Sequence, residues 1–171
     1  MLHLIPQVQT LKILEGTFTA AAVRYDGPAL DERVAAALAC LPCAPDGAPL
    51  DIAIHGEDGE GYTLTIHPAA VHIRAAGPAG AFYAIQTLRQ IFAHGSIPCL
   101  YIEDKPDFPY RGFYHDVTRG KVPTLDTLKA LEDEMAYYKL NSLQLYVEHT
   151  FPFAEYASVL PQTGYLTGEE M

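Results

Sequence analysis

The sequence is poor in basic residues and cysteine, and it has no long apolar run. Eleven Lys and Arg stand against 21 Asp and Glu, and the net charge of −10 repels nucleic acids and anionic membranes. No apolar stretch approaches the roughly 18 residues of a membrane span. The opening residues MLHLIP lack the charged start and long apolar stretch of a signal peptide. We therefore expect a soluble, cytoplasmic chain without nucleic acid or membrane partners, although a trimmed N-terminus would remove the last indication.

Metal, redox and cofactor chemistry have little support. Three cysteines are too few for a disulfide framework, which also needs an even number. Cys40 and Cys43 have a CxxC spacing but follow a helical pattern, whereas a reactive thiol pair opens a helix. Three histidines fall on the polar faces of separate predicted strands: His55, His67 and His72. They lack the spacing of a helix-borne metal site, so we expect two loop cysteines, no metal and no cofactor.

With 171 residues, the chain is too short for a complete eight-stranded α/β barrel of roughly 250 residues. Apolar residues make up 49% and charged residues 19%, close to the globular average, so the chain can form a core. The length suits one ordinary domain, or a small domain plus part of another.

Residues 1–105 alternate strand and helix patterns. Strand patterns occupy residues 10–14, 17–23, 50–54, 62–66, 71–73 and 100–103. Only a short connection with Pro68 separates 62–66 from 71–73, which predicts a hairpin. Helical spacing marks residues 30–41 and 82–92. These patterns predict a small α+β domain, an antiparallel sheet with two helices on its apolar face.

The pattern changes from residue 106 onward. Two prolines in the segment 104–110 predict a connection. A strand over 111–117, a helix beginning after Pro123 with Thr124 as its N-cap, and a strand over 141–147 then follow. A strand, helix and strand within 37 residues form a βαβ unit with parallel strands.

Residues 108–119 are FPYRGFYHDVTR, and residues 135–143 are MAYYKLNSL. In order and spacing they resemble the first barrel strand, helix and second strand of family 20 glycoside hydrolases, the β-N-acetylhexosaminidases. Residues 80–90 resemble the helix that closes the small domain preceding that barrel. The resemblance implies a small α+β domain over 1–105 and the truncated start of a catalytic (β/α)8 barrel over 106–171.

The resemblance also implies a retaining, substrate-assisted mechanism. The 2-acetamido oxygen attacks the anomeric carbon, an Asp orients that amide, and an adjacent Glu protonates the leaving oxygen. The family carries this pair in a His-x-Gly-Gly-Asp-Glu pattern, which is absent from this sequence. The acidic pairs Glu57-Asp58 and Glu169-Glu170 lie in other contexts. We therefore expect no catalytic residue in this chain, and an inactive fragment of an active parent.

Four residues are candidate substrate contacts: Arg111, Asp116, Glu148 and His149. By resemblance, Arg111 is the arginine that grips hydroxyls of the non-reducing sugar, with an ion pair to a carboxylate as the alternative. Asp116 and Arg119 match the family's Asp-x-x-Arg at the carboxyl end of the first strand, and they equally suit a salt bridge that fixes the next loop. Glu148 and His149 end the second strand, where the sequence departs from the family's two aspartates.

The expected partner is a carbohydrate, an N-acetylglucosaminide or N-acetylgalactosaminide, bound by the full-length parent. The alternative function is a non-catalytic carbohydrate-binding or interaction module. A nucleotide-binding βαβ unit is disfavoured because no Gly-x-Gly-x-x-Gly follows the strand at 111–117. Unfinished barrel edges also predict self-association.

Overall fold

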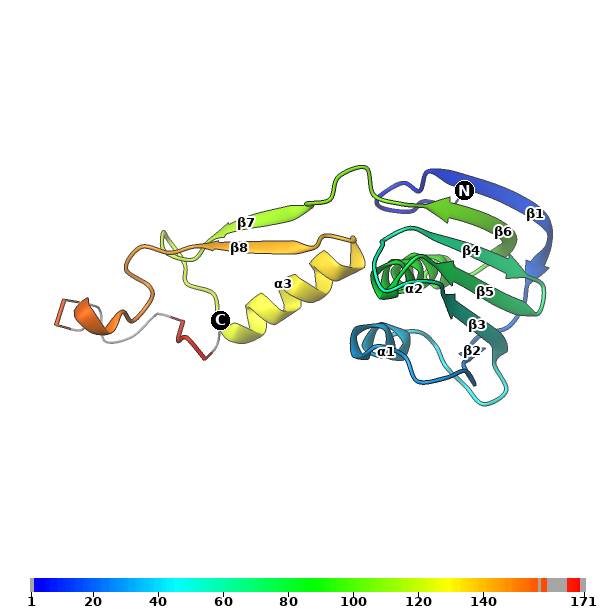
Figure 1. The fold of residues 1–171 in the computed structure, drawn as a ribbon, viewed down its shortest axis with the longest axis horizontal. Helices are drawn as coiled ribbons and strands as arrows, with labels where there is room; N and C mark the ends of the chain where they lie inside the picture. Colours follow the sequence, from blue (N-terminus) through cyan, green and yellow to red (C-terminus); the bar gives the residue numbers. More distant parts are fainter. Residues whose placement is uncertain (1, 157, 160–165, 170–171) are drawn as a thin grey trace. The chain divides into compact units, whose positions relative to one another are not determined.

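The computed structural model describes residues 2–156, 158–159 and 166–169. The chain divides into two compact units, Met1–Asp107 and Phe108–Met171 (Figure 1). Among the described helices, none combines the length and apolar character needed to cross a membrane.

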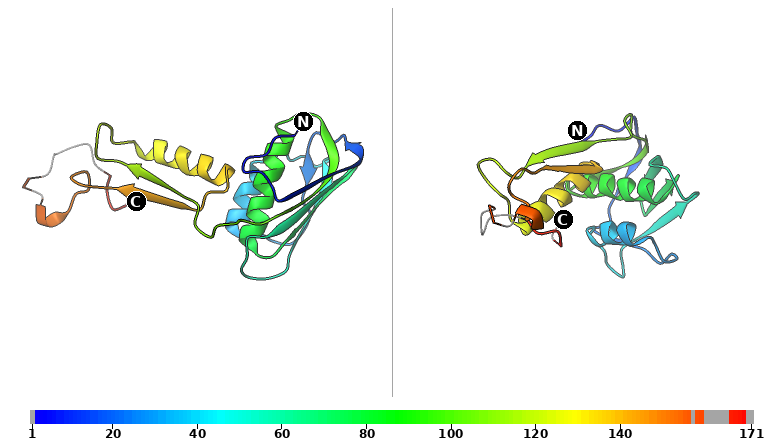
Figure 2. Two further views of the ribbon diagram at one scale, coloured as in Figure 1. Left: turned by 90° about the horizontal axis from the view of Figure 1, so that it is seen from above. Right: turned by 60° about the vertical axis from the view of Figure 1, so that its left-hand side comes forward.

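The first unit is a sheet with two helices. Its elements are β1 (Thr10–Phe18), β2 (Val23–Arg24), α1 (Glu32–Ala39), β3 (Ala48–Ile54), β4 (Tyr62–His67), β5 (Ala70–Ala75), α2 (Pro78–Phe92) and β6 (Ile97–Asp104). The strand order is β1-β6-β4-β5-β3-β2. α2 lies along one face of this sheet and contacts β3, β4 and β5, and α1 packs beside α2 (Figure 2).

The core of this unit lies between α2 and the apolar face of the sheet. Its largest fully buried apolar side chains include Leu64, Ile66, Ile73, Ile85, Leu88, Ile91, Leu100 and Ile102. Burying one such side chain contributes about 1.5–3 kcal/mol. The period-two alternation of β4 and β5 places every second residue on this face, and the two strands form the predicted antiparallel hairpin.

The prediction of an antiparallel sheet holds for the pairs β1–β6, β6–β4 and β4–β5 but was wrong for β3. The sheet is mixed, because β3 runs parallel to both β2 and β5. Alternation identifies the apolar face of a strand but is the same for both strand directions. The two segments predicted over 10–14 and 17–23 were also wrong, since β1 is one strand whose register shifts between Ile13 and Thr17, and β2 is a separate short strand.

The second unit contains β7 (Gly112–Asp116), α3 (Leu125–Tyr137), β8 (Ser142–Tyr146) and the short 3-10 helix Ala154–Tyr156. β7 and β8 pair in parallel, as the strand–helix–strand pattern predicts. Thr124 caps α3, because its Oγ1 accepts a hydrogen bond from the backbone N–H of Thr127 at 3.3 Å. Buried Val117, Leu128 and Leu166 form a small core.

Gly80 permits the close approach of α2 to the loop before β4. A Cβ at Gly80 would lie 2.5 Å from the carbonyl oxygen of Gly61, a backbone atom that cannot move aside cheaply. We expect Gly80→Ala to destabilise the fold by about 1–3 kcal/mol despite the better helix propensity of alanine, as measured by urea unfolding.

The matched control is Gly61→Ala, whose Cβ would lie 3.8 Å from the Cβ of Lys105, an ordinary contact. Its effect should stay within about 0.5 kcal/mol. Equal unfolding midpoints for the two variants would contradict the packing argument.

Candidate functional site

The carboxyl ends of β7 and β8 lie side by side because the two strands are parallel. The last register pair joins Asp116 to Tyr146. The segments that follow these ends carry Arg119 and Glu148, so a guanidinium, two carboxylates and a phenol gather at one edge of the sheet.

The Asp116 carboxylate organises the turn after β7. Its Oδ1 accepts hydrogen bonds from the backbone N–H groups of Thr118 (2.9 Å) and Arg119 (3.1 Å), and its Oδ2 accepts one from Arg119 Nε (2.7 Å). These bonds, the one from Thr118 most of all, hold the pKa of Asp116 below its ordinary value. The predicted salt-bridge alternative is therefore present in the structure.

Tyr146 connects the two strand ends. The Arg119 guanidinium carbon lies 4.9 Å from the centroid of the Tyr146 ring, within cation–π distance. The Tyr146 hydroxyl donates a hydrogen bond to Glu148 Oε1, and this bond is the main reason that the pKa of Tyr146 is raised. Arg119 and Glu148 are thus linked through one aromatic side chain.

Two buried threonines link the segments that follow β7 and β8 by hydrogen bonds. The hydroxyl oxygens of Thr118 and Thr150 lie 3.1 Å apart, and Thr118 Oγ1 accepts a hydrogen bond from the backbone N–H of Glu148 at 2.9 Å. The turn after β7 is therefore bonded directly to the turn after β8. The sequence interpretation missed both threonines and Tyr146; the two-residue spacing of Tyr146 and Glu148 was the signal available for the tyrosine.

Arg111 lies at the other end of β7. Its Nε donates to the carbonyl oxygen of Lys139 and its Nη1 to that of Phe108, each at 2.8 Å. Its backbone exchanges hydrogen bonds with Asn141, whose Oδ1 accepts from Arg111 N and whose N–H donates to Arg111 O, each at 2.9 Å. The structure thus brings Asp116 and Glu148 together but places Arg111 at the opposite strand end. Substrate contact by Arg111 stays a prediction.

The other predicted residues lie apart from this cluster or make no bond in it. His149 is exposed and follows Glu148 along the chain. Glu57 and Asp58 are exposed in the turn between β3 and β4, and Glu170 lies outside the described residues. Within the described ranges, no three Cys, His, Asp or Glu side chains are grouped to hold a metal ion. Cys40 and Cys43 are free and exposed.

Residues 1–105 match the sequence model of "Glycosyl hydrolase family 20, domain 2". The chain belongs to glycosyl hydrolase family 20. A family 20 β-N-acetylglucosaminidase of known structure superposes with a TM-score of 0.78 at 28% identity, covering 99% of this chain and 39% of that one. The Streptomyces plicatus N-acetyl-β-hexosaminidase has the same fold, with a TM-score of 0.76 at 24% identity, over 98% of this chain and 41% of that one.

Curated relatives of this family 20 chain are glycoside hydrolases. The β-hexosaminidase of Akkermansia muciniphila is 40% identical over 93 residues, which are 52% of this chain and 19% of the relative. The N,N′-diacetylchitobiase of Vibrio harveyi is 34% identical over 110 residues, 63% of this chain and 12% of the relative. The chain therefore spans less than a fifth of the length of either relative.

Because the pKa of Asp116 is lowered, the stability of the turn after β7 depends on pH. An unfolded Asp titrates near about 3.9, so stabilisation by the native carboxylate is complete above that pH and is lost as the pH falls through the lower native pKa. We expect the amide shifts of Thr118 and Arg119, followed by NMR, to titrate with a midpoint below about 3.9. Asp116→Asn should abolish this titration.

Asp133→Asn on the exposed surface of α3 is the matched control and should leave the titration intact. A wild-type midpoint at or above about 3.9 would show that the Asp116 carboxylate is not stabilised by these bonds.

Proposed function

We propose that the chain is the N-terminal part of a β-N-acetylhexosaminidase that removes terminal N-acetylhexosamine residues from glycans. The observation that carries this proposal is the parallel β7–β8 pair, which follows a family 20 domain 2 and gathers Asp116, Arg119 and Glu148 at its carboxyl ends. In (β/α)8 barrels the active site is built at this end of the strands. Residues 106–171 would then begin the barrel.

In this proposal the parent uses the retaining, substrate-assisted mechanism. The acetamido oxygen of the sugar attacks the anomeric carbon, and an adjacent Asp and Glu orient the amide and protonate the leaving oxygen. The chain's own residues supply binding. Asp116 and Glu148 offer carboxylate oxygens to sugar hydroxyls, and Arg119 offers donors.

Arg119 is oriented and exposed in a way that suits binding of sugar hydroxyls. Asp116 holds its Nε at 2.7 Å, which orients the planar guanidinium, and 68% of the side chain is exposed. Among the described residues its terminal Nη groups make no hydrogen bond, so they are available to two adjacent hydroxyls. Its place just beyond the carboxyl end of β7 therefore favours Arg119 for the grip that the resemblance gives to Arg111.

Lysine variants of the two arginines in the full-length parent distinguish these roles. Arg119→Lys keeps the charge but loses the bidentate fork, and one charge-assisted hydrogen bond of about 1.5–3 kcal/mol corresponds to a roughly ten- to hundredfold lower kcat/KM. Arg111→Lys should lower the melting temperature and leave kcat/KM of the folded enzyme near that of wild type, because its side chain donates to the backbone carbonyls of Lys139 and Phe108. The reverse pattern would return the substrate contact to Arg111.

The purified 171-residue chain should not turn over an aryl N-acetyl-β-glucosaminide, because the Asp-Glu pattern is absent from its sequence. Activity above a boiled control would contradict the proposal. The reading frame offers a second test. Its continuation for roughly 200 residues, as a barrel of about 250 requires, with a Gly-Asp-Glu motif supports the enzyme. A stop codon after Met171 supports the non-catalytic carbohydrate-binding module instead.

Two further expectations stay proposals. Among the described strands, β7 and β8 pair only with each other, and their open edges favour self-association of the chain. Sedimentation of the purified chain tests this point. The second proposal is a cytoplasmic location, as expected in the sequence analysis.

A further inference from the structure

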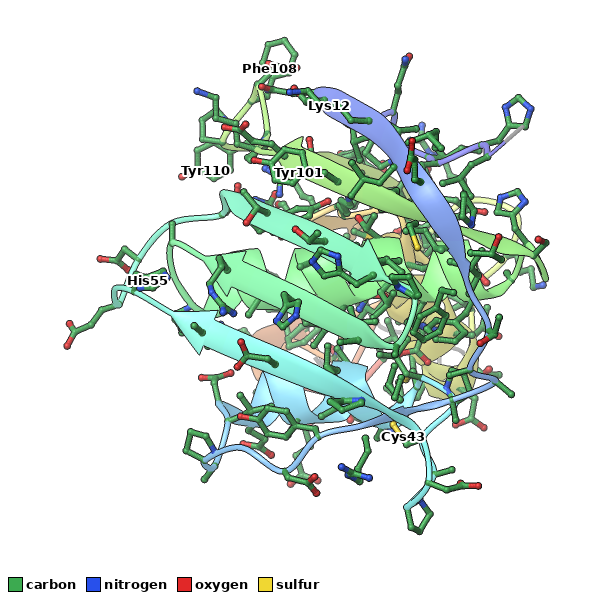
Figure 3. All side chains as sticks on the ribbon, turned by 90° about the vertical axis from the view of Figure 1, so that its right-hand side faces the viewer. Lys12, Cys43, His55, Tyr101, Phe108 and Tyr110 are labelled. Carbon is green, nitrogen blue, oxygen red and sulfur yellow. The ribbon has the colours of Figure 1, made fainter. Side chains whose placement is uncertain are left out.

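The face of the six-stranded sheet opposite α2 is polar (Figure 3). Strand register sorts its side chains into two rows that cross the sheet. One row consists of Ala53, Arg74, Thr63 and Glu103, and the other of Asp51, His72, Thr65, Tyr101 and Lys12. These residues are half-buried or exposed, whereas their neighbours along each central strand are mostly buried in the core.

An open cavity of about 280 Å³ lies at the first row. Its lining includes Gln9, His55, Thr63, Arg74, Glu103 and Asp104. This volume is just below the range of about 300–1,000 Å³ that is usual for ligand pockets, so the cavity suits one small ligand group. We name it the open-face cavity.

Hydrogen bonds from the core fix one carboxylate of the open-face cavity. The Tyr62 hydroxyl donates to Asp104 Oδ2 at 2.9 Å and lies 2.6 Å from Thr87 Oγ1, whose hydroxyl therefore donates to Tyr62. The backbone N–H of Gln9 donates to Asp104 Oδ1 at 3.3 Å. The buried tyrosine thus connects the cavity to α2 and holds Asp104 in place.

Two more lining groups are held from the second row. Tyr101 donates a hydrogen bond to Glu103 Oε2 at 3.3 Å. Arg74 Nη2 forms an ion pair with Asp51 Oδ2 at 2.6 Å. Figure 3 shows Tyr101 beside Lys12 on this face. A site whose groups are oriented before binding loses less conformational entropy when a ligand arrives.

The lining combines donors and acceptors with balanced charge. Glu103 and Asp104 offer acceptors, Arg74 and Lys105 offer donors, and these four formal charges cancel. His55 is exposed and its backbone N–H donates to the carbonyl oxygen of Ala75 at 2.9 Å, whereas its ring makes no hydrogen bond to any described residue, so the ring nitrogens can pair with a ligand. Balanced charge gives no preference for an ion, whereas alternating donors and acceptors match hydroxyl groups, which both donate and accept.

We propose that the open-face cavity binds an uncharged sugar residue of a glycan. The site goes beyond the proposed hydrolase activity and does not depend on it, because every group that forms it belongs to residues 2–107. Its ligand is a polyhydroxyl ring that hydrogen-bonds with Glu103, Arg74 and His55.

The test is an NMR titration of the 171-residue chain with N,N′-diacetylchitobiose, a neutral disaccharide. We expect saturable shifts at the amides of Thr63, Arg74 and Glu103. Glu103→Ala should weaken binding about tenfold, the consequence of losing one charge-assisted hydrogen bond, and His55→Ala about threefold, because it removes a neutral bond. Both side chains are exposed, and the dispersion of the spectra verifies that the variants fold.

Glu15→Ala is the matched control, because Glu15 is an exposed glutamate of β1 outside the lining of the cavity. It should bind like wild type. The proposal is overturned if the lining residues show no shift, or if Glu103→Ala and Glu15→Ala bind equally well. Because the assay measures binding without turnover, an inactive parent would refute the proposed hydrolase and leave this result unchanged.

Discussion

The apolar contact between α2 and the sheet is the interaction on which the first unit depends. Leu64, Ile73 and Leu88 are completely buried in it, and such burial is the main favourable term in folding. The contact also ties down the N-terminal segment, because the Gln90 side chain on α2 accepts from Ile5 N at 2.8 Å and donates to Ile5 O at 2.7 Å. With one sheet face buried here, the opposite face is free to be polar.

The second unit is built differently. Its core is small, and large aromatic side chains of β7 remain exposed, 43% for Phe113 and 55% for Tyr114. Hydrogen bonds instead fix the two strand ends, through Arg111 and Asn141 at one end and through the Thr118–Thr150 contact at the other. Parallel sheets are normally covered on both faces, which agrees with the proposal that this unit begins a larger barrel.

The elements that sequence patterns predicted well are those with local causes. Thr124 and Pro123 predicted the start of α3, and the short connection at Pro68 predicted the β4–β5 hairpin. The direction of β3 could not be predicted. Side chains alternate between the two faces of a strand in the same way in parallel and antiparallel sheets.

The candidate site was predictable only in part. The positions of Asp116 and Glu148 at strand ends were the basis for choosing them as candidate site residues. The structure places both in one cluster with Arg119. Thr118 and Thr150 have no spacing that marks them, since their partners lie in another loop. The partners of the Arg111 side chain include backbone carbonyls, which every residue has, so sequence alone gave no sign of them.

The central claim is that stability resides in the contact between α2 and the sheet, and native-state hydrogen exchange of the 171-residue chain tests it most directly. Amides of β4, β5 and β6 should exchange only through global unfolding. Amides of β7 and β8 should exchange through a smaller opening free energy, because their unit buries few apolar side chains. Equal or greater protection in β7 and β8 would contradict the account.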